Sequence, residues 1–597
     1  MNEGTPPDGQ RDPIDPITLE IIRHGLNAIP NHIDTNITRT AFSPLVFEYK
    51  DYAVGIVDHA GQLISQCKGG IPIFVANALG TAVRDGLAIY GPDGFEAGDV
   101  IMTNHAGTMG QHLNNVVMYT PILVGPNEAE LLGFMAIVVH WLDVGGTNVG
   151  SCHAADTTEI FQEGIQFRTV KLMSKGERVD DIFRMIEYNT RFPKMVLGDV
   201  SAQLAGCLMG RDMVVDLVGK YGVDTVRQAV TLGWDQSERI ARAAIRDIPD
   251  GEYAASAFLD SDGVTPDRTV AVGIKVRVEG DTMTVDFSGV ADQVPGSLNS
   301  GFNGGAVAAA RVAAKYLLTP DEPPNEGDFR PIKVQIPEGK FLSARENAPV
   351  GQSGTTLPTV VDTILWALAP AVPHRVIGAH HGTYGIHVFD GVNPATGEKF
   401  SAVNTVVGGW GAAWDRDGSG PFRSAVHGDT LEMPAELQEA LYPLRLDEFG
   451  LRIDSGGPGE FRGGLGTVKI YSVLAPCSIT LAIERSQCRP WGLFGGGPAA
   501  SGHAEVHRQD GTVEPVLKAI VRLDEGDRVL IRSGGGGGYG PPYRREAARV
   551  IADVANGVVS RDAALADYGV ALDKDLGVLE SETAAARKRM SDAETNI

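Results

Sequence analysis

The sequence has few cysteines and no long apolar run. Its 597 residues include five cysteines without a Cys-x-x-Cys pair, namely Cys67, Cys152, Cys207, Cys477 and Cys488. Scattered cysteines of this kind are typical of reduced thiols and argue against a disulfide framework or a zinc ribbon. The polar, proline-rich start of the chain predicts no secretory signal, and no apolar run reaches membrane-spanning length. We therefore expect a cytoplasmic protein that has no membrane segment.

The chain also lacks an excess of basic residues. Its 51 lysines and arginines are outnumbered by 75 aspartates and glutamates, which gives a formal net charge of −24. A protein that neutralises many phosphates needs the opposite balance, so we exclude a nucleic-acid binder. Hydrophobic residues make up 43% of the sequence and charged residues 21%, which is an ordinary globular mixture. At this length we expect two or three folding units.

No nucleotide-binding motif is present. The sequence contains neither a Walker A motif nor a Gly-x-Gly-x-x-Gly fingerprint between a strand and a helix. The stretch SGGGGGYG at residues 533–540 lacks the lysine and the following helix that a phosphate cradle requires. If the chemistry uses ATP, we expect a partner chain to bind it.

Glycine, in contrast, is abundant and clustered. It accounts for 74 residues, well above the usual share of about 7%. The clusters lie at 408–410, 455–466, 491–498 and 533–540, beside β-type runs such as TVKIYSVL and ITLAIE. This pattern predicts tight turns and close backbone approaches in a β-rich region rather than low-complexity disorder. Because Trp410, Trp491, Phe494 and Tyr539 accompany the glycines, we expect part of this region to meet a partner subunit.

Apolar periodicity gives a coarse layout. Near-helical spacing over residues 14–41 predicts a long helix, and short apolar runs between 47 and 150 predict strands. Helical patterns fill 180–245, strands resume after 250, and a charged helical tail ends the chain. The predicted fold class is α+β and multi-domain, with mixed β-sheets, flanking helices, a glycine-rich β region and a helical C-terminal tail. The predicted domains are an N-terminal α+β domain at 1–250 that holds the metal or active site, a central α+β domain at 251–400, a glycine-rich β domain at 401–540 and a helical C-terminal tail at 541–597.

One short segment gathers side chains that carry chemistry. Residues 103–117, TNHAGTMGQHLNNVV, lie between two apolar runs. His105 and His112 are seven residues apart, and Asn114 and Asn115 follow. One interpretation is a polar turn in which asparagine and glycine supply the unusual backbone angles. The other interpretation is an active site.

Seven motifs in order resemble the hydantoinase B/oxoprolinase family, from about residue 13 to the end of the chain. They are DPITLEIIRHGL with ITRTAFSP, FQEG with VKL, DFSG, PNEGDFRPIKVQIPEG, LYPLRLDEFGLRIDSGGPGEFRGGLG, RPWGLFGGGP and SGGGGGYG. The family comprises one subunit of ATP-dependent hydantoinases, the B half of 5-oxoprolinase, a lactamase subunit, and subunits of acetone and acetophenone carboxylases.

The resemblance implies a divalent metal site. The residues that match the family's ligands are Asp51, His112, Asn115 and His140, and the set suits Zn²⁺ or Mn²⁺. Two departures weaken the predicted ligand set. Asn115 stands where the family has one aspartate, and His105 stands where the family has a second aspartate. Trp141 also replaces a second histidine. The open alternative is a site without metal, in which the histidines act as general acid and base or hydrogen-bond in a polar pocket.

Several other residues have two interpretations each. We place His105, His112 and Asp143 in the catalytic group, although Asp143 is equally suited to capping a turn instead of orienting a histidine. Glu163 and Glu159 are more typical of a solvated helix edge or an ion pair than of a base. For the remaining candidates we favour structural or interface roles. These candidates are His380, His381, Cys488, Trp410 and Trp414.

The resemblance also implies the reaction and the partner. A hydantoinase A-type ATPase subunit binds ATP and Mg²⁺ and phosphorylates a small-molecule substrate, and the present subunit completes the reaction within a hetero-oligomer. Hydrolysis of a cyclic amide, of the hydantoin, 5-oxoproline or lactam type, is the first prediction. Carboxylation of a ketone of the acetone or acetophenone type is the alternative. A non-catalytic scaffold with a degenerate metal site is the third possibility.

Overall fold

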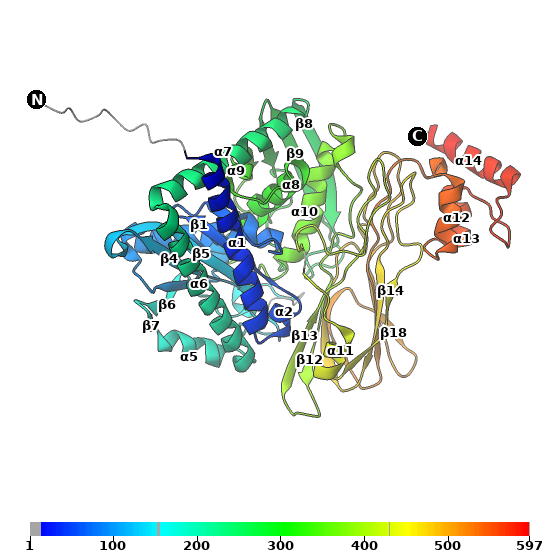
Figure 1. Ribbon diagram of the computed structural model, residues 1–597. Coiled ribbons are helices and arrows are strands. Elements are labelled where there is room, and N and C mark those ends of the chain that lie inside the picture. Colours follow the sequence, from blue (N-terminus) through cyan, green and yellow to red (C-terminus); the bar gives the residue numbers. More distant parts are fainter. Residues whose placement is uncertain (1–13, 152–155, 429, 596–597) are drawn as a thin grey trace, which may run out of the picture.

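The fold is given by a computed structural model that describes residues 14–151, 156–428 and 430–595 (Figure 1). Cys152 and the polar stretch 1–13 lie outside the described residues. The other four cysteines are free thiols. In the described part of the chain, no helix combines the length and the apolar character needed to cross a membrane.

The N-terminal half is built on a seven-stranded antiparallel sheet with the order β2-β1-β5-β4-β3-β6-β7. Its central strands are buried along nearly their whole length, because both faces of the sheet are covered. The strands are β1 Tyr52–Asp58, β2 Leu63–Gln66, β3 Val100–Thr103, β4 Asn115–Val124, β5 Glu130–His140, β6 Val170–Ser174 and β7 Glu177–Arg178.

Alternate residues of this sheet face two different helical layers. Ile137 and Val139 of β5 belong to the core cluster formed with α1 and α6, whereas Ala136 and Val138 belong to the cluster formed with α3. This is the period of two that a strand imposes on its side chains. The helices are α1 Pro16–Thr40, α2 Pro44–Phe47, α3 Leu79–Tyr90, α4 Ala106–Met109, α5 Asp180–Asn189, α6 Pro193–Tyr221 and α7 Val223–Arg246.

A smaller sheet of four strands, ordered β11-β10-β9-β8, follows in the sequence. Helices α8 and α10 pack against it, and α10 is buried along most of its length. The elements are β8 Gly251–Leu259, β9 Val270–Glu279, β10 Thr282–Asp286, α8 Ala308–Leu318, α9 Glu326–Phe329, β11 Ile332–Gln335 and α10 Ser353–Leu368.

Two further sheets pack face to face through one core cluster. Their orders are β13-β12-β16-β19 and β14-β15-β20-β17-β18. The predicted domain boundary at residue 400 falls inside β13, so strands from both sides of it share a sheet. The elements are β12 Ile386–Val392, β13 Lys399–Asn404, α11 Ala435–Leu441, β14 Leu444–Leu451, β15 Thr467–Val473, β16 Cys477–Ala482, β17 His503–His507, β18 Val513–Pro515, β19 Lys518–Leu523 and β20 Arg528–Arg532.

The glycine clusters form an array of extended segments that lie outside the strands and extend above these two sheets (Figure 1). Backbone hydrogen bonds join the segments directly, for example from Gly409 N to Gly534 O, from Gly536 N to Gly464 O and from Gly537 N to Ala379 O. The close backbone approach that the clusters predict is therefore made within the chain. A contact of this region with a partner subunit stays a prediction.

Three helices end the chain, in agreement with the predicted helical tail. They are α12 Ala547–Ala555, α13 Arg561–Tyr568 and α14 Glu580–Thr595. The buried Arg545 ties them to the glycine array, because its guanidinium donates to Asp417 at 2.7 and 2.9 Å and to Asp553 at 2.8 Å. The predicted α+β, multi-domain class is confirmed.

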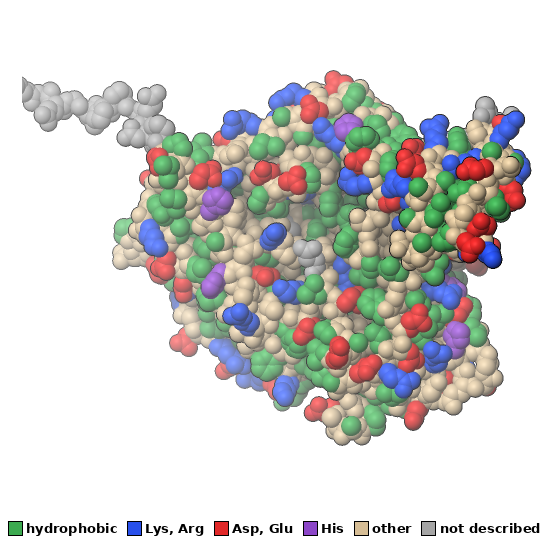
Figure 2. All heavy atoms as spheres, turned by 45° about the vertical axis from the view of Figure 1, so that its right-hand side comes forward, with side chains coloured by type: hydrophobic (Ala, Val, Ile, Leu, Met, Phe, Trp, Pro, Cys, Tyr) green, Lys and Arg blue, Asp and Glu red, His purple; other side chains and the backbone are tan. Residues whose placement is uncertain are grey.

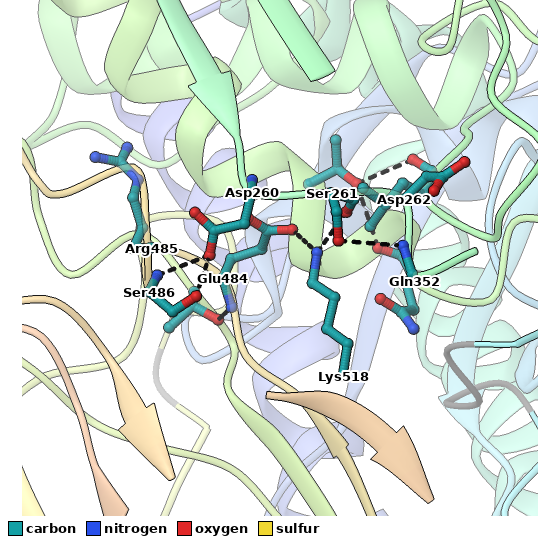
Figure 3. A network of polar contacts seen from close by, with 12 residues as sticks. Asp260, Ser261, Asp262, Gln352, Glu484, Arg485, Ser486 and Lys518 are labelled. Atoms are coloured by element: carbon teal, nitrogen blue, oxygen red, sulfur yellow. Dashed lines mark hydrogen bonds and ion pairs between the residues drawn. The ribbon is translucent and has the colours of Figure 1, made fainter. Parts of the chain in front are cut away.

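A buried polar network joins the second sheet to the third (Figure 3). Asp260, just after β8, accepts the Ser486 hydroxyl at 2.6 Å, and its own N–H donates to Glu484 at 2.9 Å. Lys518 pairs with Glu484 and donates to the carbonyl of Ser261 at 2.5 Å. Since breaking one partner of a buried ion pair leaves an uncompensated charge, this network holds the two sheets in a fixed relation.

The surface carries both signs of charge. Figure 2 shows acidic and basic side chains interspersed over one face of the molecule. Two aromatic side chains of the glycine-rich region are among the exposed ones, Trp414 at 51% and Phe494 at 46%. A partner contact at these two residues stays a prediction.

Substitution in the glycine array tests its role. A Cβ atom at Gly463 would lie 1.7 Å from the carbonyl oxygen of Gly536. We expect Gly463→Ala to lower the free energy of unfolding by about 3 kcal/mol or more, because backbone cannot move aside as a side chain can. The matched control is Gly450→Ala in β14, where a Cβ meets nothing within 4 Å. Urea titration measures both variants, and equal stability of the two would contradict the packing argument.

Candidate functional site

The predicted site residues converge at one edge of the seven-stranded sheet. Because β5 runs antiparallel to both β1 and β4, its last residue lies beside the first residues of those strands. His140 pairs in register with Asn115, and its N–H donates to the carbonyl of Asp51 at 3.0 Å. His112, in the loop before β4, places its ring 4.9 Å from that of His140. Strand pairing thus gathers four residues that are up to 89 positions apart in the sequence.

A small, partly open cavity lies between this sheet edge and the C-terminal half of the chain. Its volume is about 20 Å³, which accommodates one water molecule. Polar groups on its wall come from three regions: the sheet edge, the N-terminus of α10, and two loops of the glycine-rich part. The residues that line it are Asp51, Ile71, Ile73, Phe74, His112, Gly351, Gly354, Thr355, Tyr384, Ile386 and His427.

Burial controls the charge of the two sheet-edge groups on the cavity. It raises the pKa of Asp51 to about 7, against the opposing effects of the Tyr384 hydrogen bond and the Arg423 charge. It lowers the pKa of His112 to about 4, with a hydrogen bond to Asn115 acting in the other direction. His112 is therefore a neutral imidazole at neutral pH, and Asp51 exchanges its proton near neutral pH. A carboxyl group of this kind is suited to general base catalysis.

Two aromatic side chains from the C-terminal half complete the polar wall. The Tyr384 hydroxyl donates to Asp51 at 3.4 Å, and the Tyr384 ring stacks on the His427 ring with centroids 3.7 Å apart. A 2.5 Å hydrogen bond joins His427 Nδ1 to the Ser424 hydroxyl. Burial and the nearby Arg423 charge hold the pKa of His427 well below its usual range. His427 is therefore neutral, with Nε2 left to face Gly354.

His380 has a structural role behind this wall. Its Nε2 accepts from the N–H of Ala425 at 3.2 Å, so the proton of a neutral ring is on Nδ1, which donates to Asp362 at 2.8 Å. Asp362 also accepts from Arg485 at 3.1 Å. This chain of contacts ties the His427 loop to α10. His381, equally buried, has no hydrogen-bond partner for either ring nitrogen in the described part of the chain.

The loop that leads into α10 is held by a buried acid. Glu163, which is fully buried, accepts the N–H groups of Val350 and Gly351, both at 2.8 Å. Burial raises the pKa of Glu163 to about 8. The interpretation of Glu163 as part of a solvated edge or an ion pair is therefore wrong, because its carboxyl group is inside and holds backbone amides. Glu159, in contrast, is an exposed cap of the short helix Ile160–Glu163.

The predicted metal ligands do not form a converged set. Within the described ranges, no group of three or more His, Cys, Asp or Glu side chains is placed to hold a metal ion. His112 and His140 lie together, but Asp51 is turned to Tyr384, and Asn115 Nδ2 donates to Gln111 at 3.1 Å. The donor types suit a divalent metal, although three of them do not converge on one point in the described part of the chain. No step below therefore passes through a metal.

Two predicted catalytic residues lie away from the cavity. His105 caps α4 and contacts Thr108 at 2.9 Å and the largely exposed Glu346 at 3.1 Å. Asp143 is buried and forms an ion pair with Arg191 at 2.7 Å, and it also accepts the Ser151 hydroxyl at 3.3 Å. Its carboxylate thus anchors a loop, and a catalytic role for Asp143 stays a prediction. Turn capping was the alternative interpretation.

The contacts of the other sequence candidates are structural. Trp410 donates its indole N–H to the carbonyl of Arg423 at 2.7 Å. Trp491 stacks on Trp366 with ring centroids 4.6 Å apart. Burial raises the pKa of Cys488 to about 12, which is the opposite of activation.

Sequence reasoning missed the C-terminal contribution to the site. Neither Tyr384 and His427 nor the start of α10 was a candidate, although the sequence GQSGTT at 351–356 has the glycine and hydroxyl content typical of a helix start that approaches a ligand. Tyr384 and His427 have no local signal, because contacts between segments distant in the sequence bring their loops to the sheet edge.

With this geometry established, the comparisons decide the family. The family model described as Hydantoinase B/oxoprolinase matches residues 15–542. The chain belongs to the hydantoinase B/oxoprolinase family. Caprolactamase subunit beta of Pseudomonas jessenii is 31% identical, over 96% of the present chain and 99% of the relative.

Two solved structures share the fold of this family member. The ATP-dependent caprolactamase from Pseudomonas jessenii superposes with a TM-score of 0.90 at 30% identity, over 96% of the present chain and 100% of the other. A nucleotide-free acetone carboxylase superposes with a TM-score of 0.89 at 21% identity, over 98% and 84% of the two chains. The second likeness shows the fold alone. The predicted family resemblance is confirmed.

The buried Glu163 predicts a pH dependence of stability. Its pKa is about 8 in the folded chain and 4.5 in an exposed glutamate, so the unfolded chain loses this proton first as the pH rises. The stability linked to Glu163 is therefore complete below about pH 4.5 and is lost between about pH 4.5 and 8. We expect Glu163→Gln to remove this part of the slope of melting temperature against pH. The exposed Glu187→Gln is the control, and identical slopes in wild type and Glu163→Gln would contradict the assignment.

Proposed function

We propose that this chain is the hydrolytic subunit of an enzyme that opens a cyclic amide after ATP-dependent activation by a partner subunit. The observation that carries the proposal is the cavity itself, in which Asp51 and a neutral His112 face space for one water molecule. The similarity to caprolactamase subunit beta over nearly the whole of both chains supports the cyclic amide as the substrate class.

The chemistry assigned to each residue follows from its position. Activation of the amide oxygen by phosphorylation leaves a carbon that water can attack. Asp51 is placed to take the proton of that water, and Tyr384 holds the carboxyl group of Asp51 by its hydrogen bond. The neutral rings of His112 and His427 offer nitrogen atoms to the water or to the leaving nitrogen. The surrounding isoleucines and Phe74 exclude further solvent.

The partner we propose is a hydantoinase A-type ATPase that binds ATP and Mg²⁺. A complementary subunit is supported by the relative's designation as subunit beta. Ketone carboxylation remains the alternative inferred from the resemblance, and the substrate assay described below distinguishes it from hydrolysis. A non-catalytic scaffold is the third possibility, and the His112→Ala variant described below distinguishes a scaffold from a catalytic subunit.

A divalent ion, Zn²⁺ or Mn²⁺, at Asp51, His112 and His140 stays a prediction. We expect elemental analysis of the purified complex to give about one such ion for each present chain, and His140→Ala to reduce that content. Metal-free wild-type complex with full activity would contradict it. The role of His105 as a base also stays a prediction, separate from the cavity.

The reaction is tested on the complex assembled with its ATPase partner. We expect ATP-dependent opening of caprolactam, 5-oxoproline or hydantoin by the complex, and no ATP consumption by the present chain alone. ATP consumption with acetone or acetophenone that increases with bicarbonate would favour the carboxylase instead.

A site variant tests whether the chain is catalytic. We expect His112→Ala to lower kcat on the order of 100-fold or more, while size-exclusion chromatography shows an intact complex. His24→Ala, with an exposed side chain on α1, is the control. Full activity of His112→Ala would leave the scaffold as the better proposal.

A further inference from the structure

A second and much larger space borders the candidate site. It is an open cleft with a volume of about 910 Å³, which lies within the range that small-molecule sites occupy. Lys50 lines the cleft, and the next residue, Asp51, lines the small cavity. Ser424 also lines the cleft, and its hydroxyl is hydrogen-bonded to Nδ1 of His427, which lines the small cavity. A molecule bound in the cleft therefore lies next to residues of the candidate site.

Two lysines on the first-sheet side of the cleft have no partner charge. Lys50 precedes β1 and Lys68 follows β2, and neither forms an ion pair with another described residue. The other cation on the lining, Arg423, is already engaged. Its guanidinium donates to the carbonyl of Leu431 at 2.6 Å and pairs with Glu432 at 2.9 Å. The two lysines are therefore the cations that remain for a ligand.

The acidic side chains of the cleft do not cancel this positive charge. Glu432 pairs with Lys469 at 2.6 Å as well as with Arg423. Among the lining residues that the structure describes, Asp34 is then the one acid set against two lysines. The whole chain has a formal net charge of −24. A cleft with unpaired cations in so acidic a protein favours an anionic ligand.

The backbone at Lys50 adds an independent observation. Its φ angle is +62°, in the left-handed region that glycine adopts without steric cost and that other residues rarely adopt. Strained backbone of this kind is found preferentially at functional sites. Lysine at this position keeps an ammonium group on the cleft, although glycine would fit the backbone better.

The opposite side of the cleft is aromatic. Tyr316 comes from α8, whereas Trp410 and Phe422 come from the glycine-rich region. The rings of Tyr316 and Trp410 meet edge to face with centroids 6.1 Å apart, and the Tyr316 hydroxyl donates to the carbonyl of Ala425 at 2.7 Å. Phe422 is 54% exposed. Fixed aromatic rings of this kind provide an apolar surface for the ring of a ligand.

We propose that the cleft binds the phosphorylated form of the cyclic amide. Lys50 and Lys68 hold the phosphate, and the aromatic side chains cover the amide ring. An ammonium group is a compact charge that suits a phosphate, and the two kinds of wall match the two parts of the molecule. The inference rests on the proposed function and names the form in which the substrate reaches this chain. No bond is made or broken in the cleft.

Binding is tested with phenyl phosphate, which combines an apolar ring with a phosphate. Isothermal titration calorimetry of the full-length chain measures its affinity. We expect phenyl phosphate to bind more tightly than either inorganic phosphate or phenol. Lys50→Gly and Lys68→Met are each expected to weaken its binding on the order of tenfold. Lys220→Met on α6, outside the cleft, is the control for loss of a lysine.

The aromatic side of the cleft is tested in the same titrations. We expect Phe422→Ala to weaken the binding of phenyl phosphate and to leave that of inorganic phosphate unchanged. Phe161→Ala is the matched control, because Phe161 is exposed and does not line the cleft.

Thermal unfolding separates a binding role of Lys50 from a structural one. Lys50→Gly removes the ammonium group and relieves the left-handed backbone, so we expect an unchanged or higher melting temperature together with the loss of affinity. Lys50→Arg keeps the positive charge and is expected to restore most of the binding.

The assembled complex provides a second readout. An activated amide that escapes to solvent and loses its phosphate to water consumes ATP without opening the ring. We therefore expect the double variant Lys50→Gly, Lys68→Met to consume several times more ATP for each ring opened, whereas Lys220→Met leaves this ratio unchanged.

Three binding results would overturn the inference. They are no binding of phenyl phosphate, benzoate binding as tight as that of phenyl phosphate, which would assign the lysines to a substrate carboxylate, and tighter binding of ADP, which would make the cleft a nucleotide site. If the wild-type complex opens a cyclic amide and the double lysine variant keeps the wild-type ATP ratio, this inference alone fails. If the wild-type complex opens no cyclic amide, the proposed function fails, and the phenyl phosphate titrations still decide whether the cleft binds a phosphorylated ring.

Discussion

Direct backbone contact between glycines is the constraint on which the rest of this structure depends. In the glycine array a Cβ atom at Gly463, Gly411 or Gly537 would lie within 2 Å of a neighbouring carbonyl oxygen. In this array, extended segments that are far apart in the sequence are joined by backbone hydrogen bonds instead of side-chain packing. The loops that leave this array hold Tyr384 and His427 against the sheet edge. Without so close an approach, these two residues would not reach Asp51.

The site lies where three parts of the fold meet: the edge of the first sheet, the N-terminus of α10, and the loops that carry Tyr384 and His427. Strand pairing places Asp51 and His140 together, and the core on both faces of the sheet fixes that edge. Helix α10, which packs against the second sheet, brings Thr355 to the site. Glu163 holds the loop that leads into this helix by accepting two of its backbone N–H groups. Side chains fixed in this way are held in position for reacting groups to be oriented.

Burial gives the site its chemistry. The carboxyl group of Asp51 and the imidazoles of His112 and His427 lie in a small volume with apolar neighbours, so desolvation shifts the pKa of each toward its neutral form. Neutral bases beside a water-sized cavity suit proton transfer better than ion pairing. Asn115 fits this pattern, because an amide adds no charge where the family resemblance leads one to expect a carboxylate.

The sequence by itself determined the fold class, the long helices, the strands of the first sheet and the family, because periodicity and ordered motifs are local signals. It also located His112 and His140. The tertiary structure alone decided that Asp143 anchors a loop, that Glu163 is buried, and that the glycines contact one another within the chain. Only the tertiary structure brought α10 and the His427 loop to the cavity, since packing between distant segments leaves no local pattern in the sequence.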